Sequence, residues 1–131
     1  MAQRNTILIA EDDEMIRKII QEVIEDEYEL IMTEDGKTAI EKAKEHIPDL
    51  ILLDVMMPEM NGFDVCKELR NNKELDKSIV IMVTALSDKD SEKTGLRAGA
   101  DDFITKPFNP IELRTRIKMM FRLRDRLLGN K

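Results

Sequence analysis

The stretch Leu50-Ile51-Leu52-Leu53, which Asp54 follows at once, decides the fold of this chain. Its four aliphatic residues do not alternate with polar ones, a pattern that is typical of a strand buried on both faces of a parallel sheet. The runs Ile7-Leu8-Ile9-Ala10 and Ile79-Val80-Ile81-Met82-Val83 have the same character, and residues 29–32 and 102–105 are weaker candidates. The sequence therefore predicts five strands, spread along its whole length.

Segments with helical periodicity separate these strands, because their apolar residues recur at spacings of three and four. The apolar positions are Met15, Ile16, Ile19, Ile20, Val23 and Ile24, then Ala39, Ile40 and Ala43, then Phe63, Val65, Cys66 and Leu69, and finally Leu113, Ile117, Met120, Phe121 and Leu128. Gly99 closes a further helical segment, which lies between the fourth and fifth predicted strands. Asn109 before Pro110 predicts the start of the last helix. This alternation predicts an α/β fold, a doubly wound parallel sheet of five strands with helices on both faces.

The length and composition fit one domain. The chain has 131 residues, of which 42% are apolar, and this fraction excludes wholesale disorder although 37% are charged. No apolar run approaches the roughly 20 residues that cross a bilayer, and residues 1–6 lack the character of a signal peptide. The single cysteine, Cys66, cannot form an internal disulfide, so we expect a cytoplasmic protein that does not bind membranes.

Charge is distributed unevenly along the chain, whose net charge is −6. Residues 110–131 hold seven Lys or Arg and two acidic residues, whereas residues 1–109 are strongly acidic. The basic segment has two interpretations, a nucleic-acid arm or a solvated helix face, of which the second is favoured. With four Phe, one Tyr and no Trp, the chain has few rings on which bases stack, and we expect no direct contact with nucleic acid.

Polar side chains follow four of the five predicted strands, at the edge where ligands bind in folds of this class. The first strand leads into Glu11-Asp12-Asp13, the third into Asp54, the fourth into Thr84 and the fifth into Lys106. We assign no such group to the end of the second strand, which fits an off-centre position in the sheet. Each group alone has a structural interpretation (Asp13, for example, is suited to cap a helix). Together they predict a functional site.

Carboxylates brought to one edge of a sheet repel each other, by roughly 4 kcal/mol for two charges about 4 Å apart at an effective dielectric near 20. A divalent cation on oxygen ligands offsets this repulsion, with the ammonium of Lys106 beside it. The chain has one His and one Cys, so it holds no cluster suited to zinc or copper. We therefore predict Mg²⁺, or Mn²⁺ in its place.

Magnesium on a few carboxylates is a frequent partner of phosphate groups in proteins. A carboxylate is also a nucleophile, and Asp54, at the end of the central strand, is the candidate for an aspartyl phosphate. Lys106 and the hydroxyl of Thr84 would stabilise the transferring phosphoryl group. No Walker-type glycine loop is present, which argues against ATP as the direct donor.

In four segments the chain resembles the receiver domain of two-component response regulators. The segments are residues 7–13, residues 52–62 with the pattern D-x-x-M-P-x-M-N-G, residues 82–85 with Thr84-Ala85, and residues 99–108 with Lys106-Pro107-Phe108. They occur in the order and spacing of that family, from about residue 5 to residue 122. The resemblance implies a (βα)5, flavodoxin-like fold. It also implies a phosphoacceptor switch that is no enzyme beyond catalysing its own phosphorylation and dephosphorylation.

The resemblance further implies a metal site and a phosphorylation site. Asp54 matches the phosphorylated aspartate. The implied metal ligands are Glu11, Asp12, Asp54 and the backbone carbonyl of Met56. Asp12 would bind the metal directly and Glu11 through water. A pairing of Asp12 with Asp13 is an alternative that matches the family less well.

Three more residues match the switch of the family. Thr84 matches the switch hydroxyl, Lys106 the lysine that contacts phosphate, and Phe103 the switch aromatic, which is often Tyr elsewhere. The Lys106–Pro107 peptide is usually cis in the family. Met56 and Leu86 match the positions thought to control water access, and because both are apolar we expect slow self-dephosphorylation.

The partners implied by the resemblance are a sensor histidine kinase or phosphotransfer protein and a downstream output protein or domain. Phosphorylation would move Phe103 inward and remodel the surface of the fourth helix, fifth strand and fifth helix. Transcriptional members dimerise through this surface by pairing a basic residue with an acid, whereas this chain has acids, Glu92 and Glu112, at both positions. We therefore expect a monomer or a weak phosphorylation-dependent dimer.

We place the receiver domain at residues 1–125 and assign residues 126–131 to an extension of the last helix or the start of a linker. Whether the chain is a complete protein or an excised domain stays open. A metal-dependent phosphohydrolase is an alternative, but Met56 stands where such enzymes carry a second acid. A degenerate receiver, used only for interaction, would lack a motif position, and none is missing.

Overall fold

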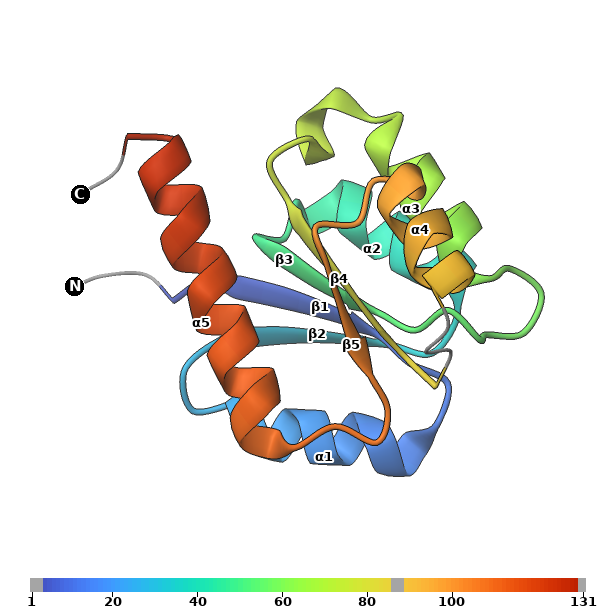
Figure 1. Cartoon of the computed structure of the whole chain (residues 1–131), viewed down its shortest axis with the longest axis horizontal. Helices are drawn as coiled ribbons and strands as arrows, with labels where there is room; N and C mark the ends of the chain where they lie inside the picture. The colour runs from blue at the N-terminus through green and yellow to red at the C-terminus, as the bar shows by residue number, and fades with distance from the viewer. Residues whose placement is uncertain (1–3, 86–88, 130–131) are drawn as a thin grey trace.

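The computed structural model describes residues 4–85 and 89–129, so Leu86 lies outside the described residues. Strands and helices alternate along the chain, as predicted (Figure 1). The strands are β1 (Thr6–Ala10), β2 (Glu29–Thr33), β3 (Leu50–Leu53), β4 (Ile79–Thr84) and β5 (Asp102–Thr105). The helices are α1 (Glu14–Ile24), α2 (Gly36–His46), α3 (Gly62–Arg70), α4 (Lys89–Ala98) and α5 (Pro110–Leu127), with a short 3-10 helix, η1, at Lys73–Leu75.

The five strands form one parallel sheet in the order β2-β1-β3-β4-β5. Helices α1 and α5 cover one face of the sheet, and α2, α3 and α4 cover the other (Figure 1). The chain therefore has the doubly wound, (βα)5 flavodoxin-like fold that the sequence predicts. The strand β2 lies at an edge of the sheet, which confirms its expected off-centre position.

The central strand β3 explains why its sequence does not alternate. Leu50 and Leu52 pack into the apolar cluster under α1 and α5, whereas Ile51 and Leu53 pack into the cluster under α2, α3 and α4. All four side chains are almost fully buried. Because both faces of the strand are covered by helices, every position is apolar until the strand ends at Asp54.

The ends of several elements agree with the local signals. The carboxylate of Asp13 accepts hydrogen bonds from the backbone N–H groups of Met15 and Ile16 and caps α1. Asn109 caps α5 in the same way, through the N–H of Ile111 at 2.7 Å. Gly99 follows α4 with a φ of +112°, a conformation that glycine adopts without strain. The Lys106–Pro107 peptide is cis, as in the family that the chain resembles.

Three apolar residues of the helical segments are exposed. Met15 and Ile19 share the helical spacing of the apolar positions, but they are 72% and 41% exposed, because Ile20 and Ile24 of the same helix fill the core position instead. Leu128, grouped with the apolar positions of the last helix, is the C-cap residue that follows the last turn of α5 and is exposed. Among the described residues, no helix combines the length and apolarity needed to cross a membrane.

Candidate functional site

Three carboxylates meet where β1 and β3 end, because these neighbouring strands are parallel and in register. Glu11 and Asp12 follow β1, and Asp54 follows β3. Each side chain offers an oxygen within 4.8 Å of the others, and among the described residues this is the one cluster with the make-up of a metal site. Glu11 and Asp54 are buried, with 2% and 4% of their surface exposed, whereas Asp12 faces solvent.

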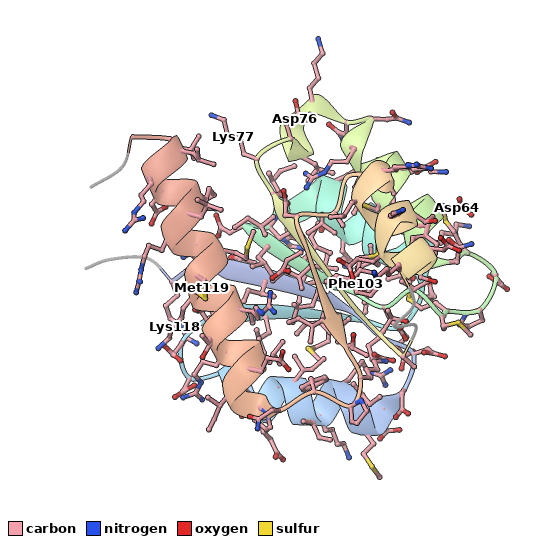
Figure 2. All side chains as sticks on the ribbon, viewed as in Figure 1. Asp64, Asp76, Lys77, Phe103, Lys118 and Met119 are labelled. Atoms are coloured by element: carbon pink, nitrogen blue, oxygen red, sulfur yellow. The ribbon has the colours of Figure 1, made fainter. Side chains whose placement is uncertain are left out.

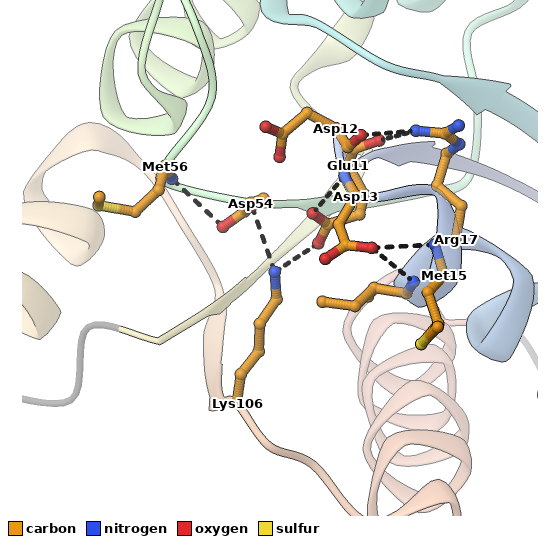
Figure 3. A network of polar contacts seen from close by, with 9 residues as sticks. Glu11, Asp12, Asp13, Met15, Arg17, Asp54, Met56 and Lys106 are labelled. Atoms are coloured by element: carbon orange, nitrogen blue, oxygen red, sulfur yellow. Dashed lines mark hydrogen bonds and ion pairs between the residues drawn. The ribbon is translucent and has the colours of Figure 1, made fainter.

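Lys106 reaches into this cluster from the loop after β5 (Figure 3). Its Nζ atom lies 2.5 Å from Oε1 of Glu11 and 3.2 Å from Oδ2 of Asp54. The two carboxylates are almost completely shielded from water and the Lys106 side chain is largely so, which makes this a mostly buried charge network with two acids on one ammonium. The structure thus confirms that Glu11, Asp12, Asp54 and Lys106 lie together, as their strand ends predict.

Burial is the largest influence on the electrostatics of Glu11. It raises the pKa of Glu11 from 4.5 to about 7, with the hydrogen bond from Lys106 opposing the shift and the charge of Asp54 adding to it. Burial lowers the pKa of Lys106, but the hydrogen bond to Glu11 and the charge of Asp54 outweigh it, so this pKa lies above its ordinary value. Lys106 is therefore a cation at neutral pH, and Glu11 exchanges its proton there.

Main-chain contacts hold the two buried carboxylates in place. The N–H of Asp54 donates to the carbonyl of Ala10 at 3.0 Å, which ties the residue to β1. The N–H of Met56 donates to Oδ1 of Asp54, and the N–H of Asp13 donates to Oε2 of Glu11, both at 3.2 Å. The carboxylate of Asp13 is itself the cap of α1 and does not belong to the metal-site cluster.

A glycine makes the turn after Asp54 feasible. A Cβ atom at Gly62 would lie 2.3 Å from the carbonyl oxygen of Asp54 and 2.8 Å from Cα of Val55. The N–H of Gly62 also donates to the carbonyl of Val55 at 2.8 Å. The first turn of α3 therefore packs directly against the backbone of the candidate nucleophile, which explains a glycine at this position.

Thr84 and Phe103 lie on the neighbouring strands. Thr84 is fully buried at the end of β4, next to Thr105 in the sheet, and its carbonyl accepts a hydrogen bond from the N–H of Lys106 at 2.7 Å. Phe103 (Figure 2) is half-buried, and its ring lies 3.3 Å from the point where a Cβ atom at Gly95 would stand. The switch aromatic of the resemblance therefore lies directly against α4.

One residue beside the site, Arg17, was missed by the sequence analysis. Glu34, just after β2, lies at the same edge of the sheet and forms an ion pair with Arg17 at 2.9 Å. The guanidinium of Arg17 also donates to the carbonyls of Glu11 and Asp12. An arginine on the polar face of α1 was the sequence signal, but its side chain's contact with a loop cannot be inferred from spacing.

Comparisons with known proteins agree with this fold and site. Residues 7–118 match the family described as the response regulator receiver domain. The transcriptional regulatory protein PhoP of Bacillus subtilis is 41% identical over 117 residues, which are 88% of this chain and 48% of the relative. A probable transcriptional regulator, ycf27, of Porphyridium aerugineum is 40% identical over 129 residues, which are 98% of this chain and 52% of the relative.

Solved structures give the same result. The receiver domain of DrrB, described as BeF3-activated, has a TM-score of 0.83 and 31% identity, over 92% of this chain and 99% of that one. The chemotaxis response regulator CheY4 of Vibrio cholerae has a TM-score of 0.85 and 29% identity, over 89% and 98%. A parallel (βα)5 sheet with acids and a lysine at its carboxyl edge thus defines a class of signalling domain. This chain belongs to the response regulator receiver domain family.

The chain is accordingly a receiver of two-component signal transduction, a signalling domain. It spans about half the length of the curated relatives that it matches. Those relatives are described as transcriptional regulators, and a further one, from Formosa agariphila, as a histidine kinase.

Proposed function

We propose that Asp54 is the phosphoacceptor of this receiver and that a sensor histidine kinase or phosphotransfer protein is the donor. One observation supports this proposal most strongly. The buried carboxylate of Asp54 lies 3.2 Å from the ammonium of Lys106 and within 4.8 Å of the oxygens of Glu11 and Asp12. A nucleophile, a cation and metal ligands are thus assembled around one side chain, the carboxylate of Asp54.

The ligands offered at this edge fit Mg²⁺, with Mn²⁺ as a substitute. The carboxylates of Glu11, Asp12 and Asp54 are hard oxygen donors, and the carbonyl of Met56 is proposed as a fourth. Three acids face one ammonium, so the cluster retains negative charge for a divalent cation to neutralise. When bound, the cation would stabilise negative charge on the phosphoryl oxygens.

The chain's own residues suit an in-line transfer. A carboxylate oxygen of Asp54 attacks phosphorus, and the bond from phosphorus to the donor's imidazole nitrogen breaks, with its electron pair staying on nitrogen. The N–H of Met56 already holds Oδ1 of Asp54, which orients the carboxylate. Lys106 would exchange its contact with Asp54 for a phosphoryl oxygen, and the hydroxyl of Thr84 would donate to another.

The output would leave through the surface formed by α4, β5 and α5. Phosphorylation replaces the single negative charge of the Asp54 carboxylate with about −1.5 to −2 on the phosphoryl group, so the site gains up to about one negative charge. Thr84 and Lys106 move toward this charge, and Phe103, which packs against Gly95 of α4, follows. Arg116 of α5 donates to Asp102 of β5 at 3.1 Å, so the two elements respond together. We propose an output protein or domain as the partner, and a monomer or weak phosphorylation-dependent dimer.

The remaining proposals concern context. We assign residues 1–125 to the receiver domain and residues 126–131 to an extension or linker, and we propose a cytoplasmic location.

The exposed, apolar side chain of Met56 supports slow self-dephosphorylation, because it offers no group that positions water beside Asp54. A Met56→Asn variant should shorten the half-life of the phosphorylated form. An unchanged half-life would contradict this part of the proposal.

The proposed function is tested with acetyl phosphate and Mg²⁺, followed by intact-mass spectrometry. The wild-type chain should gain one phosphoryl group, and this gain should disappear with EDTA. Asp54→Asn should gain none. Asp64→Asn is the matched control, because Asp64 is an exposed aspartate on α3 and its loss should leave phosphorylation unchanged. Absence of modification in the wild-type chain would refute the proposal.

A further inference from the structure

Arg17 connects two loops at the active edge of the sheet. Its Nη1 donates to the backbone carbonyl of Glu11 at 2.8 Å and to that of Asp12 at 3.1 Å (Figure 3). Its Nη2 donates to Oε1 of Glu34 at 2.9 Å. The side chain is only 13% exposed, although it belongs to the helix α1 whose polar face is otherwise solvated. A long, charged side chain is thus ordered by three hydrogen bonds.

The position of Arg17 on α1 makes this contact sterically natural. Its backbone N–H donates to the carbonyl of Asp13, the N-cap residue, in the first turn of the helix. The side chain then runs back toward the N-terminus, as side chains of helices do, and reaches the loop that precedes the cap. The carbonyls of Glu11 and Asp12 are on either side of the Asp12 Cα atom. Because Nη1 of Arg17 donates to both carbonyls, it restrains the backbone of Asp12.

This restraint matters because Asp12 has few other constraints. Its side chain is exposed, whereas Glu11 and Asp54 are packed in the interior. The orientation of the Asp12 carboxylate toward the cluster is therefore determined largely by its backbone. The opposite end of the guanidinium is anchored on Glu34, so the loop after β1 is fixed against the loop after β2.

We propose that Arg17 is a positioning residue for the phosphoacceptor site, acting through the main-chain carbonyls of Glu11 and Asp12 with Glu34 as its anchor. The inference rests on the proposed function, because it concerns metal ligands of that site. Arg17 touches neither the cation nor the phosphoryl group. It holds the acidic loop in the arrangement that binds Mg²⁺, and outer groups of this kind commonly change metal affinity by about 10- to 100-fold.

The variants differ in how many hydrogen bonds of the Arg17 guanidinium they retain. Arg17→Ala removes all three hydrogen bonds and should weaken Mg²⁺ binding by about 10-fold or more. Arg17→Lys keeps the charge but replaces a planar fork by a point donor, so its affinity should be intermediate. Glu34→Gln leaves the carbonyl contacts in place and should weaken binding by only a few fold, since the anchor loses its charge.

Lys18 provides the matched control. It follows Arg17 on α1 and carries the same charge, but its side chain is 70% exposed and pairs with Glu14 of the same helix at 3.6 Å. Lys18→Ala should leave Mg²⁺ affinity within about 2-fold of wild type, because an exposed pair on a helix surface contributes little. The control separates positioning by contact from a general change of charge on the helix.

The experiment is an NMR titration of each variant of the 131-residue chain with MgCl₂ at constant ionic strength, followed by acetyl phosphate labelling over the same Mg²⁺ range. For Arg17→Ala, the Mg²⁺ concentration at half-saturation should rise in both measurements, while labelling at saturating Mg²⁺ returns to the wild-type level. Global unfolding would lower that final level instead. Should Arg17→Ala fail to fold, Arg17→Lys and Glu34→Gln carry the same test.

Two outcomes would overturn the inference while the proposed function stands. Arg17→Ala and Arg17→Lys could bind Mg²⁺ as tightly as the wild-type chain does. Alternatively, Lys18→Ala could lose as much affinity as Arg17→Ala, which would assign the effect to charge at a distance. A wild-type chain that neither binds Mg²⁺ nor accepts the phosphoryl group would overturn the proposed function, and the inference with it.

Discussion

Replacing Lys106 with methionine removes the ammonium that lies 2.5 Å from Glu11 and 3.2 Å from Asp54. The substitution keeps an unbranched side chain of similar length, so packing changes little and charge changes most. Two buried carboxylates are left without their shared cation. We expect the metal-free protein to lose stability at alkaline pH, and to recover most of it on acidification.

The magnitude follows from the distances. At an effective dielectric near 20, the attraction over 3.2 Å is roughly 5 kcal/mol, and the repulsion between two carboxylates at the 4.8 Å limit is roughly 3.5 kcal/mol. These gross energies are not reached, because Glu11 takes up a proton instead. Keeping Glu11 protonated at pH 8, one unit above its pKa of about 7 in the wild-type protein, costs the variant about 1.4 kcal/mol. Losing the charged hydrogen bond from Lys106 to Asp54 adds about 1.5 kcal/mol. The expected loss at pH 8 is about 3 kcal/mol.

The sign of the pH dependence follows from the raised pKa of Glu11. The native protein holds a proton on Glu11 up to about pH 7, whereas the unfolded chain releases it near 4.5. This group therefore stabilises the native state below pH 4.5, and that contribution is lost as the pH rises through 7. At pH 5.5 Glu11 is protonated in both proteins, so the difference between them should narrow to about 1.5 kcal/mol.

The assay is urea unfolding in EDTA at pH 8 and pH 5.5, with Lys118→Met as the matched control. Lys118 pairs with Glu27 at 3.3 Å, but its side chain is half exposed, so the control should lose less than about 1 kcal/mol at either pH. Saturating Mg²⁺ should raise the free energy of unfolding of Lys106→Met more than that of the wild-type chain. An equal loss at both pH values would show that packing, and not charge, is what Lys106 provides.

Three further outcomes are expected. Gly62→Ala should lower the free energy of unfolding by more than about 2 kcal/mol in urea, because its Cβ would lie 2.3 Å from the carbonyl oxygen of Asp54; a smaller loss would mean that the turn can move. Burial raises the pKa of Cys66 to about 11, so a disulfide reagent at pH 8 should modify this thiol only after denaturation, and rapid labelling of the native chain would contradict its burial. Mg²⁺ at ten times its dissociation constant should stabilise the wild-type chain by about 1.4 kcal/mol and Asp12→Asn far less, as thermal unfolding would reveal; equal shifts would remove Asp12 from the ligand set.

The strands and the main site were predictable because they depend on local pattern and simple topology. An unbroken aliphatic run such as Leu50–Leu53 indicates a strand covered on both faces, and parallel strands bring their carboxyl ends to one edge. That alone places Asp54 beside Glu11, and Lys106 across from both. The motif spacing then supplies the family.

What could not be predicted depends on side-chain direction and depth. Helical spacing does not say which of two adjacent apolar stripes faces the sheet. The exposure of Met15 could not be predicted for this reason. Arg17 reaches main-chain carbonyls of a loop, a contact that leaves no periodic trace in sequence. The raised pKa of Glu11 arises from burial, which requires knowing how deeply the loop after β1 is covered.

Locating the phosphoryl group is the measurement that bears most directly on Asp54. The chain is treated with acetyl phosphate and Mg²⁺, reduced with borohydride, which converts an aspartyl phosphate to homoserine, and digested for peptide mapping. We expect homoserine at position 54 in the wild-type protein, at no other aspartate, and nowhere in Asp54→Asn. Modification at another residue, or equal modification of Asp54→Asn, would contradict the assignment of Asp54 as the phosphoacceptor.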